Sequence, residues 1–161
     1  MAVVNLPSIP VNADVFVDAN VLIYAVLGKS NECHAFLARL GTDVAGYSDA
    51  KVFHDCMHKL MLAESGKKSA GELKKYPALI KTLTKWKLNA ELIRKLPIEW
   101  IDMDTAQVGK VPAQATADGL LCGDALIRVN MSAYGINAIV SNDIDFEKLG
   151  CTVYAPTDLV Q

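Results

Sequence analysis

Short apolar, β-rich runs alternate along this chain with longer amphipathic helical runs. The first pair is DVFVD at residues 14–18, followed at once by the helical run ANVLIYAVL at residues 19–27. The helical runs are long enough to connect strands that point in the same direction. This alternation is typical of a doubly wound α/β sandwich, in which helices cover both faces of a parallel sheet.

The same pattern predicts a central parallel sheet of four to five strands. The predicted strands are 14–18, 43–48, 98–102, 138–143 and 152–156. The predicted helices are 19–27, 32–40, one from Ser48 or Asp49 to 64, 77–93, 104–117 and 123–134. In sheets of this kind, ligands bind outside the carboxyl ends of the strands, where the strand order reverses.

Length and composition indicate one cytoplasmic domain. A chain of 161 residues buries roughly two-thirds of its unfolded surface, and 52% of these residues are hydrophobic. We therefore expect a single domain over residues 1–161, with residues 1–13 as an N-terminal extension. No run approaches the ~18 apolar residues that cross a bilayer, and no secretion signal is recognisable. The four cysteines stand singly, as is typical of reduced thiols inside a cell.

Positive charge is concentrated in one part of the chain. Residues 59–95, here called the basic segment, carry ten Lys or Arg and three Glu, whereas the whole chain has a net charge of −2. Residues from about 66 to 96 are predicted to form a basic helical hairpin inserted into the domain. Such segregation indicates either a surface that contacts a polyanion or lysines that merely keep a hairpin soluble, and the charges alone leave both open.

Four carboxylates are expected to meet at one edge of the sheet. Asp18 and Asp143 end two predicted strands, Asp124 lies in the first turn of a helix, and Asp55 projects from the polar face of another. Taken singly, each has an ordinary structural explanation, such as capping a helix. Together they would repel one another unless a cation neutralised them, and oxygen ligands suit Mg²⁺ or Mn²⁺. Such an ion can activate water against a phosphodiester, so the acids predict a metal-dependent nuclease.

Several motifs, taken in order, resemble the PIN domain, and more narrowly the VapC-type toxins of toxin–antitoxin pairs. They are VFVDANVLIYA, a helix with a central acid before MHKLML, GLLCGDALI, and IVSNDIDF followed by LGCTVYAP. The resemblance covers residues 14–158. It implies a PIN-like α/β/α fold and an endoribonuclease that depends on Mg²⁺ or Mn²⁺.

The resemblance also implies roles for individual residues. The four catalytic acids fall on Asp18, Asp55, Asp124 and Asp143. Three of these, Asp18, Asp124 and Asp143, fall on the metal ligands. Asp145 would be an auxiliary acid, and Ser141 and Asn20 would be polar residues that assist within the site.

The chain departs from the family pattern at two positions. The second acid is usually glutamate, whereas Asp55 is shorter by one methylene and would reach a metal ion through water. Gly123 stands where related toxins often carry a polar residue. Because of the missing glutamate, a catalytically silent PIN-like module that binds RNA or protein remains an alternative to the enzyme.

The stretch HDCMH, residues 54–58, raises a different possibility. It differs by one residue from the zinc-peptidase motif H-E-x-x-H, in which two histidines one helical turn apart bind zinc. That chemistry needs a third ligand and a glutamate base, but only His34 remains among the histidines. We expect instead a packed, neutral His54 beside the apolar side of the helix, with His58 on its polar face.

The basic segment contains candidates for RNA contact. These candidates are Lys81, Lys85, Lys87 and His58. Trp86 could stack on a base, although its apolar neighbours favour burial in the core or at a dimer surface. The leading hypothesis is an endoribonuclease toxin that leaves a 5′-phosphate and a 3′-hydroxyl. The resemblance further implies a small antitoxin partner and a homodimer, and a PIN-domain nuclease of RNA maturation is the near alternative.

Overall fold

Six parallel strands form one sheet in the computed structural model, which describes residues 3–159. The sheet has the order β1-β6-β5-β2-β3-β4, and every neighbouring pair is parallel. The strands are β1 (Val3–Asn5), β2 (Ala13–Val17), β3 (Val44–Asp49), β4 (Ile98–Ile101), β5 (Ala138–Val140) and β6 (Thr152–Ala155). The predicted doubly wound α/β fold is confirmed, with six strands in place of four to five.

The additional strand is β1, from the segment that we predicted to be an N-terminal extension. It pairs with β6, so that Val3 lies opposite Val153 from the other end of the chain. The run Val3–Asn5 is too short to show the apolar pattern that predicts a strand. Since β6 supplies the hydrogen bonds, local sequence could not reveal this strand.

Strand β2 lies at the centre of the fold. Val15, Phe16 and Val17 are fully buried, as expected for a parallel strand covered on both faces. From β2 the chain continues to β3 and β4 on one side, and it later returns to β5 on the other side. The strand order therefore reverses between β2 and β5, and a ligand crevice is expected at their carboxyl ends.

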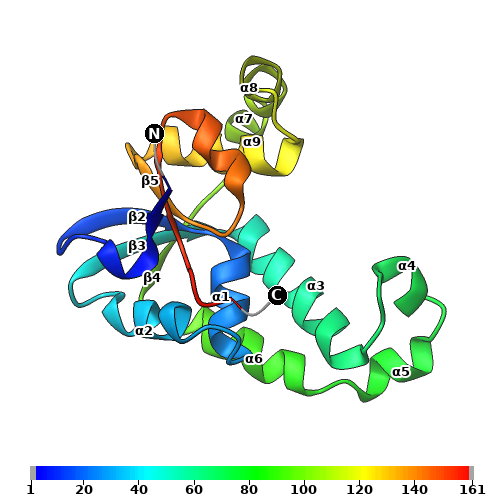
Figure 1. Ribbon diagram of the computed structural model, residues 1–161. Helices are drawn as coiled ribbons and strands as arrows, with labels where there is room; N and C mark the ends of the chain where they lie inside the picture. Colours follow the sequence, from blue (N-terminus) through cyan, green and yellow to red (C-terminus); the bar gives the residue numbers. More distant parts are fainter. Residues whose placement is uncertain (1–2, 160–161) are drawn as a thin grey trace.

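Helices lie on both sides of the sheet, and one of them runs far beyond it (Figure 1). On one side lie α1 (Ala19–Val26), α2 (Asn31–Arg39) and α6 (Lys85–Arg94). On the other lie α7 (Thr105–Val108), α8 (Val111–Asp118), α9 (Cys122–Ala133) and the 3-10 helix η2 (Ile144–Leu149). Helix α3 (Ala50–Ser65) leaves the sheet and leads to α4 (Ala70–Leu73) and α5 (Pro77–Thr82). Within residues 3–159, no helix has the length and apolar character needed to cross a membrane.

Helix α3 forms where the sequence predicted it. The Asp49 side chain caps it by accepting a hydrogen bond from the Val52 amide at 2.8 Å, and Gly66 ends it with a φ of 67°. Its buried stripe is Val52, Cys56 and Leu60. Because these residues face the core, the opposite side of α3 is free to carry charged side chains along the edge of the sheet.

Two predicted helices are each divided in two. The helix expected over 104–117 is interrupted at Gly109, and Pro112 occupies the first turn of α8, where its missing amide hydrogen costs nothing. The helix expected over 77–93 is interrupted at Leu83, whose backbone is extended and whose side chain is buried. Burial of Leu83 thus turns the chain between α5 and α6.

A carboxylate from α3 caps α6, the second half of the helix expected over 77–93. The Glu64 carboxylate accepts hydrogen bonds from the amides of Thr84 at 2.9 Å and Trp86 at 2.8 Å, at the start of α6. Burial favours the neutral carboxyl, but these backbone hydrogen bonds lower the pKa of Glu64 below its ordinary value. The Trp86 ring packs half-buried against the core, so its predicted burial is confirmed only in part.

Candidate active site

Asp18 follows β2 and caps α1. Its Oδ1 accepts a hydrogen bond from the Ala19 amide at 2.7 Å, and its Oδ2 accepts from Ser141 Oγ at 2.7 Å and Asn20 Nδ2 at 3.0 Å. Burial raises the pKa of Asp18, although these hydrogen bonds and the charge of Lys59 act in the opposite direction. The two residues expected to assist, Ser141 and Asn20, are therefore direct partners of Asp18.

Hydrogen bonds extend from Asp18 across the point where the strand order reverses. Asn20 Oδ1 accepts from the Asn142 amide at 3.1 Å, and Ser141 Oγ accepts from the Asp143 amide at 3.0 Å. These bonds join the turn after β2 to the turn after β5. Because β5 ends at Val140, Asp143 follows the strand and caps η2.

Asp145 lies beside Asp143 but has a cation of its own. The Asp145 amide donates to Asp143 Oδ1 at 2.9 Å, and Lys148 Nζ lies 2.9 Å from Asp145 Oδ1. Both members of this ion pair are largely exposed, so water screens it strongly. The auxiliary acid is thus near the predicted ligands, with its charge already balanced.

Asp124 lies in the first turn of α9, where a helix dipole favours negative charge. Burial raises its pKa, and the negative charge of Asp143 raises it further, with smaller contributions from Asp18 and Asp145. Asp124 forms no ion pair within residues 3–159, although Arg128 lies one turn later on the same helix. Asp18, Asp124 and Asp143 therefore share one electrostatic environment.

Asp55 has a close cationic partner on its own helix. Lys51 Nζ, one helical turn earlier in α3, lies 2.6 Å from Asp55 Oδ2, and both side chains are 32% exposed. Burial would lower the pKa of Lys51, but Asp55, and then Asp18 and Asp124, raise it above its ordinary value. The available signal was the spacing of Lys51 and Asp55 on one helix face.

Gly123 lies against the same ammonium group. A Cβ atom added to Gly123 would be 2.9 Å from Lys51 Nζ and 3.3 Å from its Cε. The missing side chain thus makes room for Lys51 beside Asp124. Sequence comparison with the family pattern marked Gly123 as a departure, and the structure supplies a steric reason for it.

The ligand chemistry of these acids suits a hard divalent ion. All the donors are carboxylate oxygens, and the charge of Asp143 disfavours ionisation of Asp124 until a cation is present. In residues 3–159, however, no three Asp, Glu, His or Cys side chains stand together as a ready-made metal site. Asp18 is occupied by hydrogen bonds and Asp55 by Lys51, so an ion would compete with these contacts.

A model of the PIN domain family matches residues 15–150. The chain belongs to the PIN domain family. The resemblance that the motifs indicated is therefore confirmed. No curated protein sequence matches the chain.

Solved structures share the fold of this PIN domain over most of its length. VapC20 from Mycobacterium tuberculosis, a sarcin–ricin loop cleaving toxin, has a TM-score of 0.61 at 13% identity and covers 86% of this chain and 96% of its own. VapBC2 from Rickettsia felis, bound to a DNA fragment from its promoter, has a TM-score of 0.58 at 16% identity, covering 88% and 98%. VapBC-1 from nontypeable Haemophilus influenzae has a TM-score of 0.54 at 10% identity, covering 88% and 97%. At such identities the likeness concerns the fold alone.

The histidines of this PIN domain do not form a zinc site. The His54 and His58 rings stack with centroids 6.4 Å apart, and His54 Nδ1 lies 3.9 Å from Asp55 Oδ1, but in the described part of the chain no three His, Cys, Asp or Glu side chains form a group that could hold a metal ion. The prediction of a packed His54 is wrong, because its side chain is 74% exposed. At about 100° per residue, His54 points roughly 200° away from Val52 and Cys56, which are buried.

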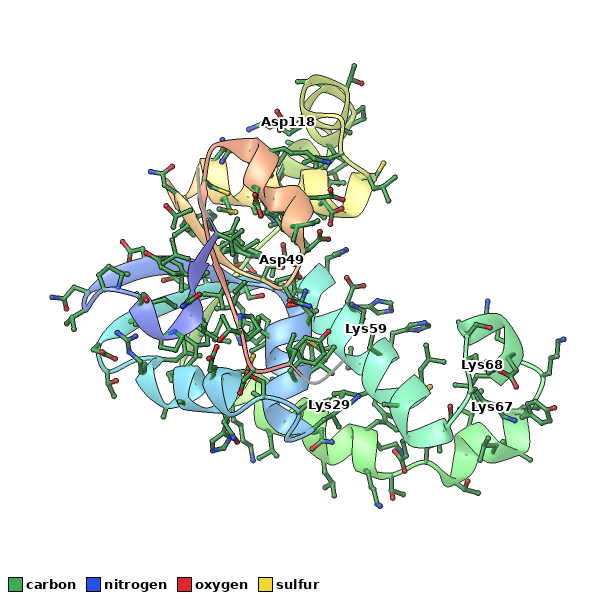
Figure 2. The ribbon with its side chains drawn as sticks, in the orientation of Figure 1. Lys29, Asp49, Lys59, Lys67, Lys68 and Asp118 are labelled. Atoms are coloured by element: carbon green, nitrogen blue, oxygen red, sulfur yellow. The ribbon has the colours of Figure 1, made fainter. Side chains whose placement is uncertain are left out.

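The residues predicted to contact RNA are exposed on three helices, α3, α5 and α6. Lys81 lies on α5, Lys85 and Lys87 lie on α6, and His58 lies on α3, one turn after Asp55. Figure 2 shows other lysines of the basic segment, with Lys59 nearer the sheet and Lys67 and Lys68 beyond it, towards α4. The part of the basic segment that carries Lys67 and Lys68 therefore extends beyond the sheet, whereas α6 returns to pack against it.

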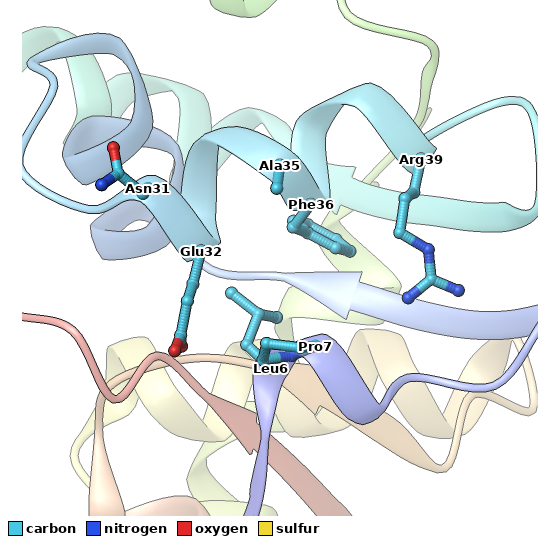
Figure 3. Close-up of a pocket in the computed structure, with 7 residues that line it drawn as sticks. All are labelled: Leu6, Pro7, Asn31, Glu32, Ala35, Phe36 and Arg39. Carbon is cyan, nitrogen blue, oxygen red and sulfur yellow. The ribbon is translucent and has the colours of Figure 1, made fainter.

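A well-formed hollow lies away from the acids. It has a volume of about 330 Å³ and lies between η1 (Leu6–Ser8) and α2 (Figure 3). Its lining residues are Leu6, Pro7, Asn31, Glu32, Ala35, Phe36 and Arg39. None of the predicted site residues lines it, so the candidate active site is defined by charge and hydrogen bonding at the sheet edge.

Proposed function

We propose that this PIN domain is an endoribonuclease of the VapC type, which hydrolyses RNA phosphodiesters with Mg²⁺ or Mn²⁺. The observation that best supports the proposal is that the charges of Asp18 and Asp143 act on Asp124, where the strand order reverses between β2 and β5. Each comes from a different element, and the pKa of Asp124 is raised partly by the charges of the other two. Carboxylates whose charges raise the pKa of a neighbouring carboxyl are typical of functional sites.

In this mechanism, acidic side chains would hold the ion, and polar side chains orient those acids. Asp18, Asp124 and Asp143 would hold the ion, and Ser141 and Asn20 orient the Asp18 carboxylate through their hydrogen bonds. When bound, the ion would lower the pKa of a water molecule and neutralise charge on the phosphate. Asp55 would orient the attacking water, and Asp145 would assist. The products would be a 5′-phosphate and a 3′-hydroxyl.

The basic segment supports an RNA substrate. Lys81, Lys85, Lys87 and the nearby His58 are exposed and free to approach phosphates. Contacts of this kind depend strongly on salt, because RNA releases bound counterions when lysines replace them. The body of the domain carries the acids, so the lysines would hold the RNA while the acidic site cuts it.

A toxin role with a protein partner follows from the family and the similar structures. The structures named VapBC and VapC support a small antitoxin that covers the acidic site, and an arginine of the antitoxin would suit its negative charge. A homodimer would place two acidic sites along one RNA. Growth arrest on expression, relieved by the product of a neighbouring short reading frame, separates this toxin from a nuclease of RNA maturation.

A cleavage assay tests the enzymatic proposal. Structured RNA is incubated with Mn²⁺ and the wild type, Asp18→Asn or Asp124→Asn, with Asp14→Asn as the matched control. Asparagine retains the helix-capping ability of Asp18, and Asp14 is an exposed residue near the opposite end of β2. We expect both site variants to lose at least about 100-fold in rate and the control to match the wild type.

One observation favours the silent module as the second candidate. Asp55 replaces glutamate and is paired with Lys51 at 2.6 Å. If the wild type binds RNA yet gives no metal-dependent product, the domain is a binding module and the nuclease proposal is wrong.

A further inference from the structure

We propose that Lys51 is an internal cation of the acidic site, admitted by Gly123, and that it competes with a divalent ion for the carboxylates. The inference rests on the proposed metal-dependent function and assigns a regulatory residue to the same site. Lys51 is a positioning residue here, since it acts on Asp55, Asp124 and Asp18, not on the RNA.

The geometry places the ammonium between two elements that carry acids. Lys51 and Asp55 both belong to α3, whereas Gly123 and Asp124 begin α9. Lys51 Nζ is 2.6 Å from Asp55 Oδ2, and Gly123 has no side chain to exclude it. A side chain at position 123 would need the space that the ammonium now occupies.

Lys51 differs from the other lysine paired with an acid of the site. Lys148 binds Asp145 with its side chain 70% exposed, whereas Lys51 is 32% exposed and its charge also reaches Asp18 and Asp124. A partly desolvated ammonium interacts more strongly with its neighbours than an exposed one. Lys51 therefore supplies positive charge to the site before any ion arrives.

Metal binding and the Lys51 contact must oppose each other. A divalent ion among these carboxylates would lie near the ammonium, and their mutual repulsion is enough to weaken binding about tenfold even with water-like screening. A bound ion would also attract Asp55 and would weaken the Lys51–Asp55 pair. Asp55 would then be free for the role expected of the second acid.

Two variants remove the contact in different ways. Lys51→Gln keeps most of the side-chain length and removes the charge. Gly123→Ala keeps every charge but places a Cβ where only the flexible tip of Lys51 needs to give way, and alanine suits the helix better than glycine. Lys59→Gln is the matched control, because Lys59 also lies on α3 and its charge lowers the pKa of Asp18 more than that of Lys51 does, whereas Lys51 also contacts Asp55 and acts on Asp124.

Calorimetric titration of the full chain with Mn²⁺, without RNA, tests the proposal. We expect Lys51→Gln to bind Mn²⁺ about tenfold more tightly than the wild type, Gly123→Ala about threefold more tightly, and Lys59→Gln within about twofold. Thermal unfolding with EDTA and with Mn²⁺ is the second readout. It should show a larger Mn²⁺-induced rise in Tm for Lys51→Gln than for the wild type.

Failure of this inference can be told apart from failure of the nuclease. Unchanged or weaker Mn²⁺ binding by Lys51→Gln, with metal-dependent cleavage by the wild type, overturns the Lys51 proposal alone. If neither the wild type nor any variant binds Mn²⁺, both the Lys51 proposal and the metal-dependent function are wrong. Tighter binding by Lys59→Gln equal to that of Lys51→Gln would show a general charge effect and would also overturn it.

Discussion

The negative charge of Asp124 is disfavoured in the folded protein. Burial and the charge of Asp143 raise its pKa, so the folded protein binds a proton there more tightly than the unfolded chain does. This contribution favours folding below the ordinary pKa of 3.8 and is lost as the pH rises through the raised folded value. A residue retained at a cost in stability is typical of an active site.

Asp124→Asn should therefore stabilise the protein while abolishing cleavage. Without the charge, we expect the Tm in EDTA at pH 7 to rise by about 2 °C, a modest value because water screens this partly exposed site. Thermal unfolding at pH 7 and at pH 4 measures the difference, which should shrink at the lower pH. A Tm at pH 7 below that of the wild type would contradict the prediction.

The four cysteines should differ sharply in reactivity. All are free, but only Cys122 is exposed, and burial raises the pKa of Cys33 to about 11 and of Cys56 to about 12. A thiol reagent at pH 8 should modify one cysteine per native chain rapidly and the rest, including Cys151, only after unfolding. The variant Cys122→Ser should lose the rapid phase. Rapid reaction of a second thiol in the native protein would be the contrary result.

At the scale of elements, α6 depends on a carboxylate that belongs to α3. The pKa of Glu64 lies below its ordinary value of 4.5 because the amides of Trp86 and Thr84 donate to it. Its stabilising effect is full above pH 4.5 and is lost as the pH falls through the lowered folded value. Glu64 thereby links the start of α6 to the end of α3.

Glu64→Gln should lower the Tm at pH 7 and flatten its decline towards pH 3. The neutral amide oxygen accepts the same hydrogen bonds more weakly and has no charge to lose in acid. Glu91→Gln is the control, since Glu91 lies on the exposed face of α6 and pairs only with Arg94 within residues 3–159. Parallel Tm curves for Glu64→Gln and the wild type across this pH range would exclude the proposed cap.

A buried polar network joins α3 to α9. Asp49 is fully buried, and its Oδ2 accepts from Asn130 Nδ2 at 2.7 Å while its Oδ1 caps α3. Asn130→Ala would leave one oxygen of a buried carboxylate unpaired, which should cost about 3 kcal/mol of unfolding free energy. Denaturant unfolding measures this. Gln107→Ala, which removes only a 3.3 Å bond to Asn130, should cost about 1 kcal/mol, and equal costs would refute the argument.

At the scale of the whole molecule, acids at the sheet edge and lysines on α5 and α6 should act on one RNA. Changing Lys81, Lys85 and Lys87 together to Gln should weaken RNA binding and reduce the slope of log affinity against log salt by about 2. Binding measured in EDTA separates this effect from cleavage. Lys110→Gln, on the side of the sheet that carries α7 and α8, should leave the slope unchanged. An unaltered slope in the triple variant would place the RNA elsewhere.

Much of the framework was accessible from local patterns. The period of apolar residues and a capping group at Ser48 or Asp49 predicted α3, and the run around Phe16 predicted β2. Placing acids after parallel strands predicted that Asp18 and Asp143 would lie near each other, since such strand ends share one edge. These features depend on neighbours in sequence and on the general geometry of parallel sheets, so a single chain suffices to infer them.

Other features depend on contacts between distant residues. Strand β1 exists because β6 offers it hydrogen bonds, and α6 begins where Glu64 of another helix caps it. The approach of Lys51 to Gly123 brings an ammonium into the acidic site from a helix 72 positions away in the sequence. No periodicity encodes such distances, because steric fit and charge balance between separate elements arise only when the chain has packed around β2.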